Sequence, residues 1–307
     1  MIDTIYDPDF PPTEPTSKPL VSIVLPTHQR AAKLSAALTA IADQEYQNVE
    51  VIVVYTPDTH TERLLEWFSD ETSLNVVSVL QTDGGMPHAR NMGIESASGD
   101  FVVFTDDDCV PPQNWLSAIV WTFENKDVIS VGGIDYPHPS VKHRLAARVD
   151  IERKRRNQIP DEDGVVVGGY DLRTFGGSNV AYDATVFEQH GVRHDEVQNR
   201  ENDGLFQKRI LELTGKQTAY IPVPTLHTRD YTFRGMLSQR FSNGLSALEA
   251  DGGRTLRGSV FGLLAAPFLL LYHLSLATEP KDGLGLWISD MSVRLGMVYG
   301  TIREELS

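Results

Sequence analysis

Residues 101–108 read FVVFTDDD, a short apolar run followed directly by three aspartates. The length of the run and its β-branched and aromatic content predict a buried strand. A buried strand that delivers carboxylates onto its end is costly unless a cation or hydrogen bonds compensate their charge. A divalent metal held by Asp106 and Asp108 would compensate it, while a helix N-cap or a solvated turn is the alternative explanation.

Expected strands and helices alternate along the first half of the chain. The apolar runs and helical spacings predict strands at 20–25, 49–54, 75–80, 101–105 and 128–132, and helices at 30–44, 61–68, 87–96 and 115–124. Such alternation is typical of an α/β fold with a mostly parallel sheet, flanked by helices and joined by right-handed crossovers. Ligands of these sheets bind at the carboxyl ends of the strands, which is where the aspartates lie.

The second half of the chain carries weaker signals. A glycine-rich turn at 175–179 leads into a short strand, a helix is expected at 201–213, and a further strand at 217–221 precedes His227. The basic stretch 141–158 fits either a solvated helix face or a contact with anionic lipid or a phosphate-bearing acceptor.

Charge and cysteine content exclude several classes of protein. The 307 residues include 27 Lys and Arg against 42 Asp and Glu, a net charge of −15 that would repel nucleic acid. A single cysteine, Cys109, excludes an internal disulfide framework and a multi-cysteine zinc site. Residues 1–19 lack a basic start and an apolar core, so we expect a disordered tail, no signal peptide and a cytoplasmic location.

Five motifs in a fixed order carry a family resemblance. They read VSIVLPTHQR at 21–30, QEYQNVEVIVV at 44–54, ARNMGI at 89–94, SGD at 98–100 and DDD at 106–108. Their order and spacing closely resemble family 2 glycosyltransferases, over about residues 20–230. The resemblance implies a Rossmann-like GT-A fold and inverting, metal-dependent transfer of a sugar from a nucleotide diphosphate donor, expected to be a UDP-sugar.

The resemblance also implies a set of donor-binding residues. Pro26 and Thr27 would line the nucleoside pocket beside Arg30, and Arg90 would hold the nucleotide. The acidic pair that the family usually carries after its second strand is missing from VYTPD at 54–58. Asp58 is the remaining acidic candidate for contact with uracil or ribose there.

A second set of residues would hold the metal and border the sugar. Asp106 and Asp108 are similar to the two acids of the DXD motif, with Asp106 also near the ribose, and Asp107 fills the variable middle position. His227 resembles the histidine that completes the shell of Mn²⁺ or Mg²⁺ in many such enzymes, although an ordinary hydrogen-bonded histidine is the alternative. Gly176 and Gly177 belong to a glycine loop that borders the donor sugar and the acceptor.

The segment that would carry the catalytic base departs from the family's pattern. The family carries a Glu-Asp pair whose aspartate is the base, but residues 200–204 read RENDG, which puts Asn202 in the place of that aspartate. An asparagine cannot accept the proton of a hydroxyl. Either Asp203 or Glu201 would take the role, and we favour Asp203.

The expected domain plan is a tail at 1–19, a catalytic domain at 20–230 and a helical, partly apolar C-terminal region at 231–307. Residues 259–277 contain no acid, Lys or Arg. This segment predicts peripheral contact with the cytoplasmic face of the cell membrane rather than a full crossing, with a spanning or a buried helix as alternatives. A glycan or lipid-linked acceptor is therefore expected.

Two other functions compete with this interpretation. A nucleotidyltransferase also uses paired aspartates and a metal, but it needs a glycine-rich phosphate loop, and residues 26–30 read PTHQR. A catalytically silent homologue acting as a membrane-bound scaffold would explain Asn202 and the altered segment 54–58, although the metal aspartates argue against it.

Overall fold

The structure is a computed structural model that describes residues 6–141, 144–157, 160, 164–169, 176–196, 203–250, 270–271, 273–274 and 280–306. The chain divides into two compact units, one made of residues 1–136 and 158–228 and the other of residues 137–157 and 229–307. The first unit ends at residue 228, and the catalytic domain was expected to end at residue 230. The basic segment differs from expectation, because it groups with the C-terminal helices that it contacts rather than with the sheet.

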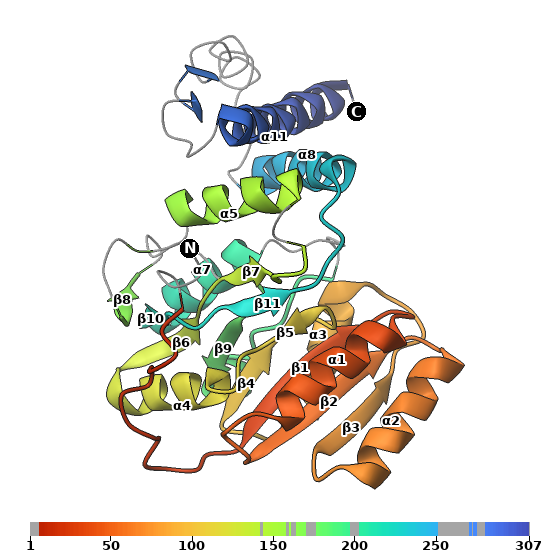
Figure 1. The fold of residues 1–307 in the computed structure, drawn as a ribbon, viewed down its shortest axis with the longest axis vertical. Coiled ribbons are helices and arrows are strands. Elements are labelled where there is room, and N and C mark those ends of the chain that lie inside the picture. Colours follow the sequence, from red (N-terminus) through yellow and green to blue (C-terminus); the bar gives the residue numbers. More distant parts are fainter. Residues whose placement is uncertain are drawn as a thin grey trace. The chain divides into compact units, whose positions relative to one another are not determined.

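The first unit contains an eight-stranded sheet in the order β3-β2-β1-β4-β9-β6-β10-β8 (Figure 1). Its strands are β1 (Val21–Thr27), β2 (Val49–Tyr55), β3 (Asn75–Leu80), β4 (Phe101–Phe104), β6 (Val128–Gly132), β8 (Val166–Gly168), β9 (Val180–Asp183) and β10 (Gln217–Tyr220). Strands β1 to β4 pair in parallel, as do β6 and β10. The mostly parallel α/β sheet predicted from the sequence is confirmed.

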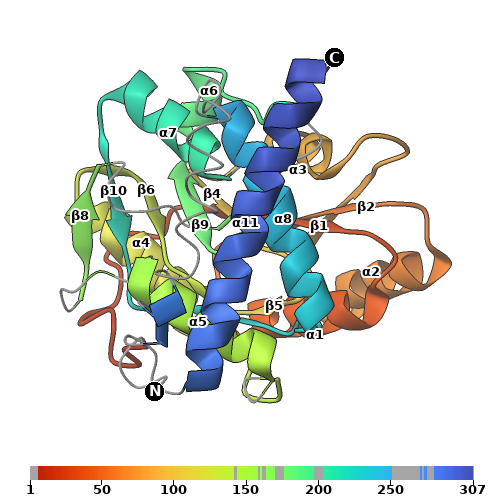
Figure 2. The same cartoon turned by 90° about the horizontal axis from the view of Figure 1, so that it is seen from above.

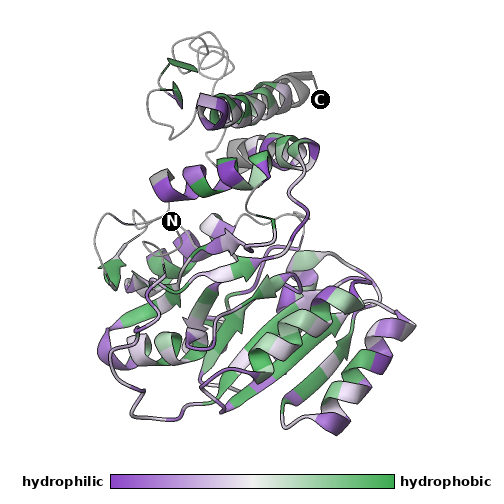
Figure 3. Ribbon diagram, viewed as in Figure 1, coloured by the Kyte–Doolittle hydropathy of each residue, from purple (hydrophilic) through white to green (hydrophobic). Residues whose placement is uncertain are grey.

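Helices complete this unit and explain the composition of its strands. They are α1 (Ala31–Ala42), α2 (Thr59–Glu71), α3 (Met86–Ser96), α4 (Trp115–Asn125), α6 (Thr185–Glu188) and α7 (Asp203–Thr214). All seven residues of β1 are buried, and Figure 3 shows the strands of the sheet as largely hydrophobic. Strands covered on both faces need such continuous apolar runs, which is why the sequence signal for them is strong.

Strand β9 departs from the predicted pattern. It lies between β4 and β6 and runs antiparallel to both. Its position brings the glycine-rich turn that precedes it next to the end of β4. The local sequence predicts the strand but carries no information on its direction, since pairing direction depends on the rest of the chain.

A second, three-stranded sheet was not expected from the sequence. It has the order β5-β11-β7 and consists of β5 (Cys109–Val110), β11 (Thr225–His227) and β7 (Asp135–Pro137). His227 is paired in register with Cys109. Strands of two or three residues are too short to show an alternating pattern.

The expected disordered tail is incorrect for residues 6–19. Phe10 is buried and packs edge-on against Trp121 of α4, with ring centroids 5.3 Å apart. Glu124 of the same helix accepts hydrogen bonds from the backbone N–H groups of Thr16 and Ser17 at 2.9 and 2.6 Å. One aromatic anchor and one carboxylate therefore order a segment whose composition resembles a disordered chain.

The second unit is helical. It contains α5 (Leu145–Asn157), α8 (Phe233–Ala250) and α11 (Pro280–Leu306), and α8 lies beside α11 (Figure 1, Figure 2). Among the described helices, none combines the length and the apolar character that a membrane crossing requires. Most of the apolar segment 259–277, for which membrane contact was predicted, lies outside the described residues.

The basic stretch on α5 is largely paired with acids. Arg153 and Lys154 lie 3.0 and 2.9 Å from the carboxylate of Asp150, and Arg155 lies 3.4 Å from Glu152. Lys154 is buried. These contacts fit neither the solvated helix face nor the contact with anionic lipid or a phosphate-bearing acceptor that the sequence left open, because acids of the same helix offset the charges of Arg153, Lys154 and Arg155.

Candidate active site

The three aspartates form a turn between β4 and β5, at the carboxyl ends of the parallel strands. Asp107 and Asp108 are buried, while the side chain of Asp106 retains 27% of its exposure. The backbone N–H of Thr105 donates to the carbonyl of Val24 at 3.2 Å, which ties the start of the turn to β1. The sheet therefore presents three carboxylates at the edge where ligands of such folds bind.

Asp106, Asp108, Cys109 and His227 form a cluster with the composition of a metal site. Each offers one ligand atom, and these atoms lie within 4.8 Å of one another. Burial raises the pKa of Asp106, and its nearest guanidinium contact, to Arg90, is 3.9 Å long. Two carboxylates and an imidazole are suitable ligands for Mn²⁺ or Mg²⁺, so the residues present fit a divalent cation.

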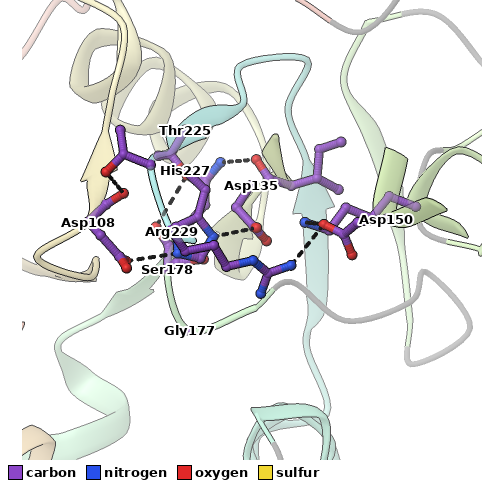
Figure 4. Close-up of polar contacts among 12 residues, drawn as sticks. Asp108, Asp135, Asp150, Gly177, Ser178, Thr225, His227 and Arg229 are labelled. Atoms are coloured by element: carbon purple, nitrogen blue, oxygen red, sulfur yellow. Dashed lines mark hydrogen bonds and ion pairs between the residues drawn. The ribbon is translucent and has the colours of Figure 1, made fainter. Parts of the chain in front are cut away.

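His227 lies between two carboxylates. Its Nε2 is 2.8 Å from Oδ1 of Asp108 and its Nδ1 is 2.9 Å from Oδ2 of Asp135 (Figure 4). Burial lowers the pKa of His227, but these hydrogen bonds outweigh burial and raise the pKa to about 9. Burial raises the pKa of Asp108, yet His227 and Lys33 outweigh it and hold that carboxyl well below its usual range. In the absence of metal, the cluster is thus a charged, hydrogen-bonded network.

Thr27 and Arg30, predicted to bind the donor, contact the aspartate turn. Thr27 Oγ1 donates to Asp107 at 2.7 Å, and Arg30 lies 2.8 Å from Asp107 and 3.3 Å from Asp108. Burial raises the pKa of Asp107 to about 6 despite these contacts. Pro26 is buried beside Thr27 at the end of β1 and is in register with Val54.

Lys33 is a further cation at this turn that the sequence analysis missed. Its Nζ lies 3.1 Å from Asp108. The signal was available, because Lys33 is three residues after Arg30, and residues three apart share one face of a helix.

Arg90, Gly177 and Asp203 form a second group of contacting residues, which adjoins the aspartate turn where Arg90 lies 3.9 Å from Asp106. Arg90 Nη1 donates to Asp203 Oδ1 at 2.6 Å, and the backbone N–H of Gly177 donates to Asp203 Oδ2 at 2.9 Å. Burial acts to raise the pKa of Asp203, but Arg90 and Gly177 lower it overall. A Cβ at position 177 would collide with the guanidinium of Arg90, so only glycine fits there without displacing that side chain.

The remaining predicted residues are less closely connected to the cluster. Gly176 lies near Asp135, and a Cβ added at Gly176 would be 3.7 Å from Asp135 Oδ1, an ordinary contact. Asp58 caps the N-terminus of α2 and accepts a hydrogen bond from the N–H of Thr61 at 3.1 Å. Its donor-binding role stays a prediction. Glu201, the alternative base, and Asn202 lie outside the described residues.

Two curated proteins of Haloferax volcanii are similar to the chain in sequence. The glycosyltransferase AglE is 32% identical over 126 residues, which cover 40% of this chain and 41% of AglE. The glucosyl-dolichyl phosphate glucuronosyltransferase is 28% identical over 221 residues, which cover 65% of this chain and 66% of that protein. The chain thus matches less than two thirds of the length of each of these relatives.

Two solved structures share the fold. The mannosyltransferase PcManGT of Pyrobaculum calidifontis, in complex with GDP-Man and Mn²⁺, has a TM-score of 0.57 at 17% identity and covers 95% of this chain and 76% of its own. TarS of S. aureus, in complex with UDP-GlcNAc, has a TM-score of 0.55 at 15% identity. The alignment covers 90% of this chain and 92% of the TarS chain. At such identities the similarity concerns the α/β fold alone, which agrees with the GT-A type predicted from the sequence.

The sequence profile of one family covers most of the first unit. The profile described as Glycosyl transferase family 2 matches residues 22–191. This range includes β1 to β4, the aspartate turn and the glycine loop. Because the match extends over more than half of the 307 residues, the chain belongs to glycosyl transferase family 2.

Proposed function

We propose that this chain transfers a sugar from a nucleotide diphosphate donor to a hydroxyl acceptor, with a divalent cation bound by Asp106, Asp108 and His227. The observation that carries the proposal is the convergence of these three side chains, from a loop and a strand 119 residues apart in sequence, onto one cluster in which Asp108 and His227 are buried. The complexes of the two fold relatives with GDP-Man and Mn²⁺ and with UDP-GlcNAc are consistent with it.

Each side of the site has a role in the proposed reaction. A divalent cation would supply Lewis-acid stabilisation of the departing diphosphate. Arg30, Lys33 and Arg90 surround the aspartates with positive charge that would attract and orient the anionic donor. Attack of the acceptor hydroxyl opposite the leaving group would invert the configuration of the anomeric carbon.

Asp203 is the proposed general base. Its lowered pKa keeps it ionised at neutral pH, as a proton acceptor must be, and it lies beside the glycine loop. Each of its oxygens accepts one hydrogen bond, from Arg90 and from Gly177, and keeps a second lone pair that can accept the proton of a hydroxyl. Glu201 remains the alternative.

The base assignment is tested with Asp203→Asn and Glu201→Gln. Loss of the true base is expected to lower kcat by about 10²- to 10⁴-fold and to leave donor binding nearly intact. Steady-state kinetics at saturating donor give kcat, and thermal stabilisation by the donor reports binding. If neither variant lowers kcat by more than a few-fold, the assignment is wrong.

A lipid-linked acceptor at the cytoplasmic face of the membrane is the proposed setting. The relative named glucosyl-dolichyl phosphate glucuronosyltransferase supports it, as does the apolar composition of residues 259–277. A soluble glycan is the alternative acceptor. Parallel assays with lipid-linked and soluble acceptors distinguish the two.

The donor is identified by a screen of nucleotide sugars with Mn²⁺ or Mg²⁺, read as thermal stabilisation. A ligand at about 100 times its Kd stabilises the native state by about 2.7 kcal/mol. We expect a UDP-sugar to give the largest rise in melting temperature. The part of that rise that requires the metal should vanish in Asp108→Asn. Asp127→Asn, which alters an exposed carboxylate paired with Lys216, is the matched control and should behave like the wild type.

The product distinguishes this proposal from its main rival. Release of a nucleoside diphosphate supports glycosyl transfer, whereas release of pyrophosphate from a nucleoside triphosphate would identify a nucleotidyltransferase. A purified chain that binds no nucleotide sugar with either metal would contradict the proposed activity.

A further inference from the structure

Asp135 contacts the metal-facing histidine from the side opposite the aspartate turn. Its Oδ2 lies 2.9 Å from Nδ1 of His227, while Nε2 of the same ring faces Asp108 at 2.8 Å (Figure 4). Asp135 begins β7 and His227 ends β11, and these strands are neighbours in the small sheet. The two residues are 92 positions apart in sequence, so this contact exists only because the small sheet forms.

The chemistry of imidazole gives this contact a consequence for metal binding. A histidine nitrogen can bind a metal only when it carries no proton, and in the neutral ring the other nitrogen then carries it. An ionised carboxylate only accepts hydrogen bonds. When a cation takes the place of the proton on Nε2, Asp135 therefore keeps the remaining proton on Nδ1, which leaves the lone pair of Nε2 for a cation beside Asp108.

The surroundings fix the ring as well as its tautomer. The side chains of His227 and Asp135 are only 10% and 14% exposed. The backbone holds the histidine strand on both sides, because Thr225 N–H donates to Ile134 O at 3.1 Å and Thr228 N–H donates to Asp108 O at 2.7 Å. The imidazole thus has little freedom to turn away from the cluster.

We propose that Asp135 is a positioning residue that sets the tautomer and the ring orientation of His227 for binding a divalent cation together with Asp106 and Asp108. The inference rests on the proposed metal-dependent function. It assigns to Asp135 no contact with the metal, the donor or the acceptor. Outer carboxylates of this kind commonly increase metal affinity by about 10- to 100-fold.

The direct test is Mn²⁺ binding without any substrate. Titration with Mn²⁺ alone, followed by the electron paramagnetic resonance signal of the free ion, gives the Kd of the wild type and of Asp135→Asn. The amide can donate to Nδ1 and so favour the wrong tautomer, and we expect the Kd to rise by about 10- to 100-fold. Asp135→Glu, which keeps a carboxylate, is expected to recover much of the loss, and Asp127→Asn should bind like the wild type.

A double variant separates a positioning role from a merely structural one. If Asp135 acts through His227, Asp135→Asn combined with His227→Gln should bind Mn²⁺ no more weakly than His227→Gln alone. If the double variant instead lost Mn²⁺ affinity by the product of the two single losses, the inference would be overturned. Melting in EDTA shows whether each variant is folded, and Asp135→Ser replaces Asp135→Asn if the latter is not.

The wild-type protein offers a measurement that needs no variant. Nitrogen-15 NMR of the His227 ring in protein saturated with Mg²⁺ is expected to show the proton on Nδ1. A proton on Nε2, or an unchanged Mn²⁺ Kd in Asp135→Asn, would overturn the inference alone. If the wild type itself bound neither metal, the proposed metal-dependent function would fail and the role of Asp135 with it.

Discussion

At the scale of single residues, Gly177 shows how a backbone position can control a side chain of the site. Its N–H holds Asp203, and the absence of a Cβ leaves room for the guanidinium of Arg90, which itself binds Asp203 at 2.6 Å. Three residues from α3, the glycine loop and α7 therefore depend on one another. Displacement of any one of them should disturb the other two.

We expect Gly177→Ala to weaken the enzyme without unfolding it. The new methyl group collides with Arg90, and a misplacement of about 1 Å near a reacting centre can lower the rate by about 10²-fold. The kcat/KM for the donor measures the effect. Gly169→Ala is the matched control, because no atom lies within 4 Å of a Cβ built there and its φ is not positive. Equal activity of the two variants would show that Arg90 does not need its present position.

His227 makes the stability of the metal-free protein depend on pH. Its pKa in the folded state is about 9, above the ordinary value of 6.5. Protonated His227 therefore contributes stability that is complete below about pH 6.5 and is lost as the pH rises through about 9. The contribution is on the order of 1–3 kcal/mol.

Urea unfolding in EDTA at about pH 6 and about pH 9.5 measures this contribution for the wild type and for His227→Gln. The difference in unfolding free energy between the two proteins should be larger at the lower pH and should shrink at the higher one. A difference that is constant with pH would mean that His227 titrates near its ordinary value.

At the scale of elements, the sequence predicts some boundaries closely and others not at all. Strands β3 and β6 have the predicted bounds, because each is an apolar run ended by polar residues or glycine. β5, β7 and β11 were not predicted, since two or three residues carry no periodicity.

The unpredicted small sheet decides which residues join the candidate site. The aspartates follow a strong strand signal, so Asp106 and Asp108 could be located from the sequence. Asp135 and Cys109 could not, because their proximity to His227 depends on long-range pairing of the small sheet. The resemblance to a family located His227. No local sequence pattern indicated that Asp135 contacts its Nδ1.

Helices α8 and α11 pack closely through glycines. Each carries a glycine at the position where the backbones come closest: a Cβ on Gly296 would collide with the carbonyl of Phe241, and one on Gly244 with the carbonyl of Val293. Alanine normally stabilises a helix relative to glycine by about 1 kcal/mol. Here the clash with backbone, which cannot move aside as a side chain can, should reverse that sign.

We therefore expect Gly296→Ala to lower the thermal stability of the protein. The neighbouring Leu295 is 50% exposed, and Leu295→Ala is the control for a change at an exposed position of α11. Differential scanning calorimetry gives both melting temperatures. A rise in Tm for Gly296→Ala would show that the two helices can separate without cost.

At the scale of the whole molecule, charge is the dominant feature. The net charge of −15 is spread over 307 residues with a pI near 5.0. Like charges repel more strongly in the compact state than in the extended chain, so the excess of carboxylates destabilises the fold. Some acids are offset locally, as Asp108 is by Lys33 and Arg30, but pairing cannot neutralise 42 acids with 27 bases.

Salt should therefore stabilise the protein at neutral pH. The Debye length falls from about 10 Å at 0.1 M to about 3 Å at 1 M, so added NaCl screens repulsion between carboxylates. Relief of about 1 kcal/mol would raise Tm by about 2–4 °C for a domain of this size. The control is the same salt series near pH 5.0, where the net charge is close to zero and the stabilisation should largely disappear. An equal rise at both pH values would point instead to preferential exclusion of salt from the surface, which does not depend on net charge.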